Sequence, residues 1–175
     1  MRLVIETGAG LPDANSYISE KDAMDNLLSS LQEQWNGFTP DERIDRLITA
    51  TQYLDLSFNW IGSQKSLEQG LCWPRTNVIY QGHTIPDNVV PKPIKRAVLM
   101  LLQLTFDYGI EIIKPSTETQ VKKEKIGALE TEYFAPSETI TSYGTAFADI
   151  NNLLAGFYST LTKGSGVQTS DVVRA

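Results

Sequence analysis

The sequence is poor in the side chains that build catalytic and metal centres. It has one cysteine, Cys72, and one histidine, His83, among 175 residues. One cysteine excludes a disulfide within the chain, and these two residues alone cannot form a zinc site. A Ser-His-Asp triad would have to use His83, which no G-x-S-x-G motif precedes. We therefore expect no catalytic residues, metal or cofactor, and a protein that is not an enzyme; Cys72 is interpreted as packing and His83 as a loop residue.

Long apolar runs and an excess of positive charge are also lacking. The longest apolar run, near residues 97–102, is too short to span a bilayer, so we expect no membrane partner and no signal peptide. The net charge is −6, with 6 basic and 12 acidic side chains in residues 1–90 and 9 of each in residues 91–175. Because nucleic-acid binders normally carry a basic patch, this balance disfavours tight binding of DNA or RNA.

The stretch from Tyr53 to Lys95 concentrates stiff residues. It contains two of the three tryptophans and a series of prolines, each of which fixes the backbone locally. We predict a long connection with a defined path, in which the tryptophans pack against neighbouring helices. Arg75 in this stretch could contact an anion, but we expect it to pair with an acidic residue or to stack on an aromatic ring.

Four segments have the apolar periodicity of amphipathic helices. Ser19 with Asp22, and Thr39 with Glu42, resemble capping boxes at the start of two of them. The predicted helices cover residues 20–32, 40–57, 92–109 and about 145–160. The third is apolar on most of its surface and is expected to be the central helix.

Residues 121–134 predict a β-hairpin with a two-residue loop that begins at Gly127. The register pairs two lysines with two glutamates, Lys123 with Glu132 and Lys125 with Glu130. Because these pairs neutralise the lysines, we interpret them as a solvated face and not as a nucleic-acid patch.

Together these patterns predict a mainly α-helical protein. We expect a bundle of about four helices around the central apolar helix 92–109, with the hairpin 121–134 and an extended C-terminal tail. One domain covers residues 1–162, and the tail covers residues 163–175. A polar, glycine-containing tail of this kind orders on a partner.

Several short motifs together resemble one protein family. They are Ala14-Asn15-Ser16-Tyr17 after a glycine-rich opening, Ala50-Thr51-x-Tyr53-Leu54-Asp55, Trp60-x-Gly62, Gln69-x-Leu71-x-Trp73-Pro74-Arg75, Ile85-Pro86 and Val90-Pro91 before a long helix. Over roughly residues 1–135 the chain resembles the head-to-tail connector proteins of tailed phages, also called adaptor or head-completion proteins. This family is often labelled "putative DnaT-like single-stranded-DNA-binding protein". The Leu-x-Trp-Pro-Arg element is its most specific part.

The resemblance implies a structural virion protein. Its protomers would form a ring, usually of twelve copies, that binds the portal protein on one side and a tail or stopper protein on the other. Genomic DNA would pass through the lumen without specific binding, which agrees with the acidic balance. The implied location is the neck of the virion, after assembly in the host cytoplasm.

Two protrusions are the expected contact surfaces. We predict that the tail binds the portal through Gly164, Gly166, Val167, Val172, Val173 and Arg174. We predict that the hairpin contacts a neighbouring subunit or lines the lumen through Lys123, Lys125, Glu130 and Glu132. The structural fingerprint of the fold consists of Trp60, Gly62, Leu71, Trp73, Pro74 and Arg75.

The alternative is a DnaT-like single-stranded-DNA-binding replication accessory protein. Such proteins combine a basic groove with aromatic rings on which bases stack. Trp60, Trp73 and Tyr80 supply aromatic rings, but the sequence shows no matching excess of positive charge. A small enzyme with an unrecognised site is the third interpretation.

Overall fold

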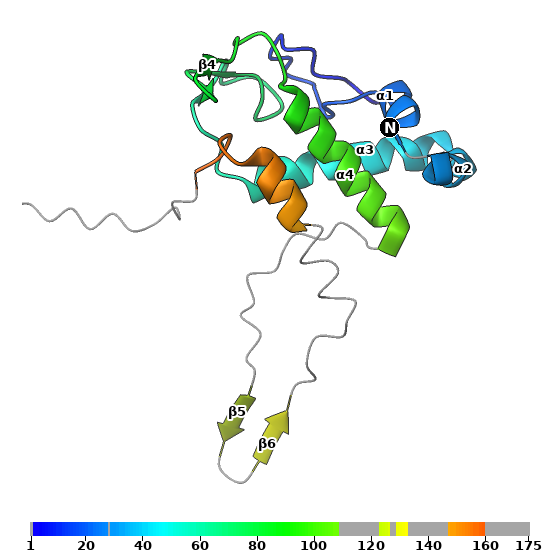
Figure 1. Ribbon diagram of the computed structural model, residues 1–175. Helices are drawn as coiled ribbons and strands as arrows, with labels where there is room; N and C mark the ends of the chain where they lie inside the picture. The colour runs from blue at the N-terminus through cyan, green and yellow to red at the C-terminus, as the bar shows by residue number, and fades with distance from the viewer. Residues whose placement is uncertain (1, 28, 109–122, 127–128, 133–146, 160–175) are drawn as a thin grey trace, which may run out of the picture.

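The computed structural model describes residues 2–27, 29–108, 123–126, 129–132 and 147–159 (Figure 1). Its helices are α1 (Glu20–Asn26), α2 (Ser29–Gly37), α3 (Pro40–Ser57) and α4 (Lys92–Tyr108), and a final helix covers residues 147–154. The strands form antiparallel pairs, β1 (Ser63–Gln64) with β2 (Arg75–Thr76), β3 (Ile79–Tyr80) with β4 (His83–Thr84), and β5 (Lys123–Ile126) with β6 (Leu129–Glu132).

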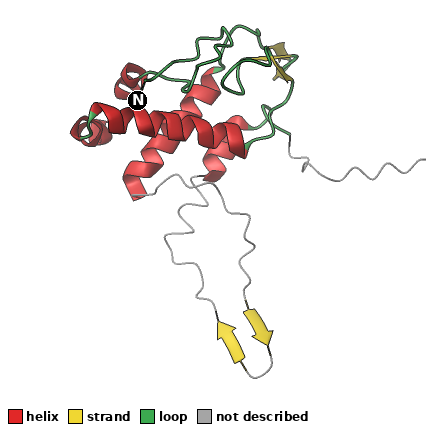
Figure 2. Cartoon of the chain, turned by 180° about the vertical axis from the view of Figure 1, so that it is seen from behind, coloured by secondary structure: helices red, strands yellow, loops and turns green. Residues whose placement is uncertain are grey.

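The architecture is mixed, so the mainly-α expectation is only partly right. α3 and α4 cross, and the loops that carry β1 to β4 gather beyond the N-terminal end of α4 (Figures 1 and 2). Each of these four strands has two residues, which is too short for an alternating pattern to show in the sequence. The long connection between α3 and α4 is therefore a region of small sheets and turns packed on a helical frame.

Both predicted capping boxes are present. The Ser19 hydroxyl accepts from the Asp22 amide at 3.0 Å, and the Asp22 carboxylate accepts from the Ser19 amide at 2.9 Å. Thr39 and Glu42 make the same reciprocal pair before α3, where Pro40 takes the first helical position. These bonds satisfy amides that have no partner inside the helix, so α1 and α3 begin where the sequence predicts.

The single helix predicted over residues 20–32 is wrong, because the chain breaks between α1 and α2. Leu27 is extended, with ψ at 146°. The Gln32 side-chain amide donates to the carbonyl oxygens of Met24 (3.2 Å) and Leu27 (3.1 Å), which a continuous helix would pair with backbone amides. Leu27 and Leu31 are each 4% exposed, so the apolar period still marks buried residues, although it spans two helices.

α4 is the central apolar helix that the sequence predicts. Its fully buried side chains are Ile94, Ala97, Val98, Leu101 and Leu102. They belong to one core cluster with side chains of α3 and of the final helix. None of the helices in the described part of the chain combines the length and the apolar character needed to cross a membrane.

The hairpin register is confirmed for the strand residues that the structure describes. In the β5–β6 pair, Lys123 stands opposite Glu132 and Lys125 opposite Glu130. The loop at 127–128 and the flanking residues 121–122 and 133–134 lie outside the described residues.

The final helix ends earlier than the predicted residue 160. Residues 155–158 form a turn in which Gly156 has φ at +93°. The Ile61 amide donates to the Phe157 carbonyl (3.0 Å), and the Ser159 amide donates to the Asn59 carbonyl (2.8 Å). The helix stops because this backbone pairs with a segment about a hundred residues earlier in the sequence.

Replacement of Trp73 tests the packing of the long connection. Trp73 is 0% exposed, and its ring meets those of Trp60 and Phe157 edge to face. We expect Trp73→Ala to lower the free energy of unfolding by roughly 3–5 kcal/mol, because it removes a large buried side chain. Urea unfolding followed by circular dichroism measures the change. The control Leu67→Ala alters a side chain that is 99% exposed, and an equal effect of both substitutions would contradict the burial of Trp73.

Candidate functional site

Arg75 fixes the path of the long connection through backbone carbonyl groups. Its Nε donates to the carbonyl of Ile61 (2.7 Å), and its terminal nitrogens donate to those of Gly62 (2.8 Å), Cys72 (3.2 Å) and Trp60 (3.3 Å). Arg75 interacts electrostatically with Asp55, which agrees with the expected acidic neighbour, but its hydrogen bonds go to backbone carbonyls. The guanidinium ties residues 60–62 to residue 72, and its donors are directed into the protein and not towards a ligand.

A half-buried carboxylate joins the long connection to α3 and to the N-terminal segment. Asp55 accepts from the Tyr17 hydroxyl (2.6 Å) and from the Cys72 amide (2.8 Å), and the Tyr17 oxygen accepts from the Trp73 amide (3.1 Å). Burial raises the pKa of Asp55 to about 6, against the opposing effect of these hydrogen bonds. Three segments far apart in the sequence therefore meet at one titratable group.

Sequence reasoning missed this network, although its residues stand in the motifs that carry the resemblance. Tyr17 ends the Ala-Asn-Ser-Tyr motif, and Asp55 ends the Tyr-Leu-Asp motif. The only sequence signal for the hydrogen bond was the presence of a tyrosine and an aspartate in two of these motifs. Their pairing could not be inferred because it depends on the tertiary fold.

The glycine-rich opening holds an anion that belongs to the chain itself. The fully buried Glu6 carboxylate accepts from the amides of Gly8 (2.7 Å), Gly10 (3.0 Å) and Leu11 (2.8 Å). Backbone amides that converge in this way form a nest for a negative group. Since Glu6 fills this nest, the loop is not a candidate site for a phosphate group.

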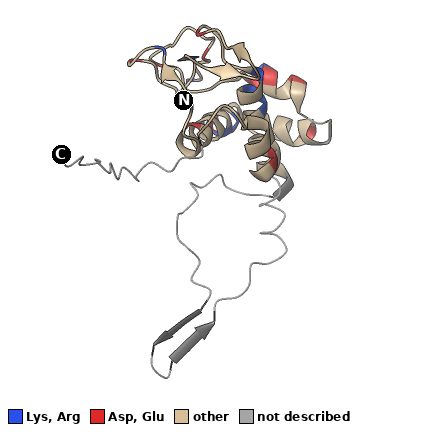
Figure 3. Cartoon of the chain, turned by 60° about the vertical axis from the view of Figure 1, so that its left-hand side comes forward, with Lys and Arg blue, Asp and Glu red and all other residues tan. Residues whose placement is uncertain are grey.

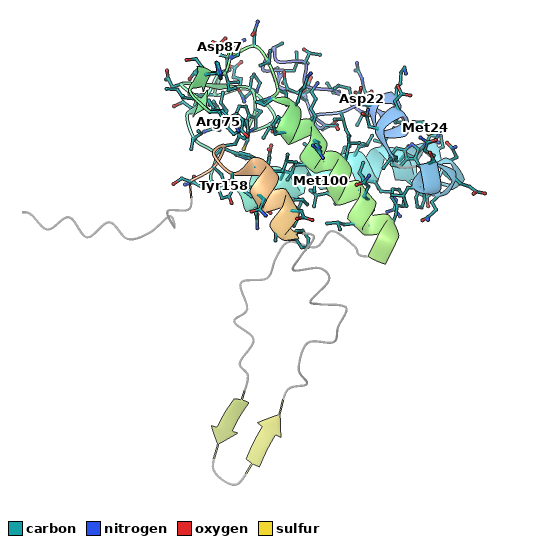
Figure 4. The ribbon with its side chains drawn as sticks, in the orientation of Figure 1. Asp22, Met24, Arg75, Asp87, Met100 and Tyr158 are labelled. Carbon is teal, nitrogen blue, oxygen red and sulfur yellow. The ribbon has the colours of Figure 1, made fainter. Side chains whose placement is uncertain are left out.

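An aromatic cluster joins the long connection to the turn after the final helix. Trp60, Trp73 and Phe157 are its buried members, at 7%, 0% and 1% exposure. Phe58, Tyr80 and Tyr158 are only half-buried and lie around them. Figure 4 shows Arg75 and Tyr158 at the same end of the molecule. The cluster thus presents aromatic side chains at the surface of the region that Arg75 fixes.

Positive charge concentrates in the same part of the chain. Residues 58–96 contain five Lys or Arg and two Asp or Glu, whereas residues 1–57 contain four and ten. Residues 1–90 have a negative total charge because they combine the acidic helices with most of the basic connection. In Figure 3 the acidic and the basic residues both stand mainly on the helices, and the loops are mostly uncharged. The candidate interface is therefore the aromatic cluster together with the cations of residues 58–96.

Three of the five cations of residues 58–96 lie in the first two turns of α4. Lys92 and Arg96 are exposed, and the half-buried Lys95 interacts electrostatically with Asp22 of α1. The first turn contains no acidic residue. These cations are therefore available to a negatively charged partner.

The reactive residues singled out in the sequence form no site. His83 is exposed on β4, and the half-buried Cys72 lies near the Asp55 backbone carbonyl, with its Sγ 3.8 Å from that oxygen. Within the described ranges, no group of three or more His, Cys, Asp or Glu side chains could hold a metal ion. No step of a reaction can be assigned to these residues.

The structure places the fingerprint residues within the long connection. Trp60, Leu71, Trp73 and Pro74 are buried, and Gly62 has φ at +72°. A Cβ at Gly62 would lie 2.3 Å from the Thr76 carbonyl oxygen, so no larger residue fits there. The predicted portal-binding residues Gly164, Gly166, Val167, Val172, Val173 and Arg174 lie outside the described residues.

Comparison with known proteins identifies the family. A family model described as "Putative DnaT-like ssDNA binding protein" matches residues 1–175, the whole sequence. The chain belongs to this family. No curated protein and no solved structure matches the chain.

The family match corrects the function expected from the sequence. The label associated with the resemblance is right, but the head-to-tail connector is wrong as the main interpretation, because the matching family is described by single-stranded-DNA binding. The virion ring, the portal and tail partners and the roles given to the tail and the hairpin depended on the connector.

The pH dependence of stability tests the raised pKa of Asp55. Asp55 titrates at about pH 6 in the folded protein, against 3.8 for its ordinary value, so the folded state binds more protons between these pH values. The free energy of unfolding should therefore fall by up to about 3 kcal/mol through this group as the pH rises from about 4 to about 6. Urea unfolding of the wild type and of Asp55→Asn across this range isolates the effect.

Other carboxylates change the stability with pH in the opposite direction. They are present in both the wild type and Asp55→Asn, so their effect cancels in the comparison. Hydrogen bonds from Ser19 and Thr39 lower the pKa values of Asp22 and Glu42, so these groups stabilise the fold above their unfolded pKa values and lose that effect in acid. A stability difference between wild type and Asp55→Asn that stays constant with pH would contradict the raised pKa of Asp55.

Proposed function

We propose that this protein binds single-stranded DNA and does not catalyse a reaction on it. The observation that carries the proposal is the match of the entire chain to a family described by single-stranded-DNA binding. Two features of the described residues support it, the positive segment 58–96 and the aromatic rings at its surface. Cations that neutralise phosphates and rings that stack on bases are the two components of such sites.

The acidic net charge does not oppose this function when the charges are placed in the fold. Of the described helices, α1 and α3 belong to the acidic segment 1–57, whereas the cations of the candidate site lie in the connection and at the start of α4. At physiological ionic strength, charges further apart than about 8 Å are largely screened at the surface. A bound strand therefore responds mainly to the charges close to it, which at the start of α4 are the cations and Asp22 of α1, and much less to the total charge of the chain.

The charges of the first turn of α4 run against the helix dipole. The N-terminus of a helix carries partial positive charge, so cations there oppose folding by about 0.3–1 kcal/mol each at low salt. Lys92 occupies this position and Arg96 lies one turn further on, with no acidic residue in the first turn. An arrangement that is unfavourable for the helix alone becomes favourable when a phosphate binds, since the dipole and the cations attract the same anion.

Reversal of two charges tests this surface. We expect Lys92→Glu combined with Arg96→Glu to weaken the binding of a labelled oligothymidine at least about ten-fold at low salt, measured by fluorescence anisotropy. Three phosphate contacts predict a slope of about −2 for log K against log salt, and the loss of two contacts should bring it to about −1. The variant should be slightly more stable than the wild type, because acidic residues suit the start of a helix.

The matched control reverses the exposed Arg2 and Lys21 of the acidic segment. Arg2→Glu combined with Lys21→Glu changes the net charge by the same amount and should alter affinity by less than about two-fold, because neither residue belongs to the positive segment and Lys21 is already paired with Asp25. An equal loss in both double variants would assign the effect to total charge and overturn the site. A wild-type protein that does not bind the oligonucleotide at micromolar concentration would overturn the proposed function itself.

A further inference from the structure

The burial of the tryptophans changes which rings can meet a nucleobase. Trp73 is 0% and Trp60 is 7% exposed, so neither indole offers an open face. Phe58, Tyr80 and Tyr158 are half-buried at the margin of the same cluster. We propose that these three rings form the surface on which bases of a single strand stack, an inference that rests on the proposed function.

The three rings are held in place by the buried members of the cluster. The Phe58 ring centroid lies 5.2 Å from that of Trp60 and 4.8 Å from that of Tyr158. Tyr80 stacks on Phe157 at 4.2 Å with an interplanar angle of 22°. Because these rings are already ordered, they lose little conformational entropy when a base stacks on them.

The backbone around the rings is also adapted to them. A Cβ at residue 156 would lie 3.2 Å from the Tyr80 ring, so Gly156 permits the close approach of that ring. An isolated bridge pairs Trp60 with Tyr158, which fixes the turn at residues 155–158 against the long connection. Phe58 and Tyr158, which come from distant parts of the sequence, are thereby kept side by side.

The charges of the same sequence segment indicate the chemical class of the ligand. Phe58 and Tyr80 lie in the segment 58–96, whose only acidic residues are Glu68 and Asp87. An uncharged apolar partner would gain nothing from the cations of this segment. A single-stranded nucleic acid presents both negative charge and flat apolar faces, whereas a duplex keeps the faces of its bases stacked inside.

The hydrogen bonds indicate which residues contact the phosphates and which contact the bases. Arg75 contacts the cluster at the Trp60 carbonyl, but its guanidinium donates to four backbone carbonyls in all. Phosphate neutralisation therefore falls to exposed cations such as Lys92 and Arg96. The aromatic rings provide the part of the affinity that does not depend on salt.

A comparison of oligonucleotides with the unaltered protein tests the inference without a substitution. Anisotropy titrations use labelled oligothymidine, the same length of abasic sugar-phosphate strand and a duplex of equal length. Each stacked base contributes about five-fold or more to affinity, so the abasic strand and the duplex should bind at least about five-fold more weakly.

Substitution locates the effect on named rings. Phe58→Leu and Tyr158→Leu should each reduce the preference for the intact strand over the abasic strand about five-fold, while binding of the abasic strand stays unchanged. The matched control is Tyr53→Leu, which removes a half-buried tyrosine that packs on Phe147 outside the cluster. Thermal melts establish that each variant is folded at the temperature of the titration.

The outcomes separate this inference from the proposed function. Binding of oligothymidine that equals binding of the abasic strand overturns the stacking surface but leaves single-strand binding through phosphates intact. An intact-strand preference that survives in both Phe58→Leu and Tyr158→Leu overturns the assignment to these rings. Failure of the wild type to bind either strand overturns the proposed function and the inference together.

Discussion

The hydrogen bonds of the half-buried Asp55 carboxylate are the constraint on which the loop region depends. Through Tyr17 and the amides of Cys72 and Trp73, this one group fixes three segments that are distant in sequence. Loss of one partner would leave buried polar groups unpaired, at a cost of about 1–3 kcal/mol each. The position of Trp73 follows from this network, and the packing of the aromatic cluster follows from Trp73.

The elements predicted correctly are those that local chemistry determines. The capping box at Thr39 begins α3, and apolar periodicity identifies α4 as the buried helix. The errors occur where a contact remote in sequence competes with the helix. The Gln32 side chain takes the carbonyls that would continue α1, and residues 59–61 pair with the turn that ends the final helix. Neither of these contacts leaves a periodic pattern of apolar residues in the sequence.

The candidate site was only partly predictable for the same reason. The sequence marks the stretch 53–95 and supplies aromatic rings and cations, but it does not say which of them face solvent. Trp60 and Trp73 were the obvious stacking residues and are buried, whereas Phe58 and Tyr158 meet only in the fold. Arg75 likewise had the chemistry of an anion contact and is occupied by carbonyl groups. The sequence shows the chemistry of each side chain, but the tertiary fold determines whether that side chain is exposed and unpaired.

The balance between charge and stacking determines what kind of binding this surface supports. A net excess of three positive side chains in residues 58–96 is modest, and the remainder of the chain is acidic. Three phosphate contacts give a weaker salt dependence than the six to ten contacts typical of strongly basic DNA-binding proteins. Binding through phosphates alone would therefore be weak at physiological salt, and useful affinity requires a contribution from the bases. Rigid rings together with a few cations meet that requirement, and they favour a strand whose bases are already unpaired.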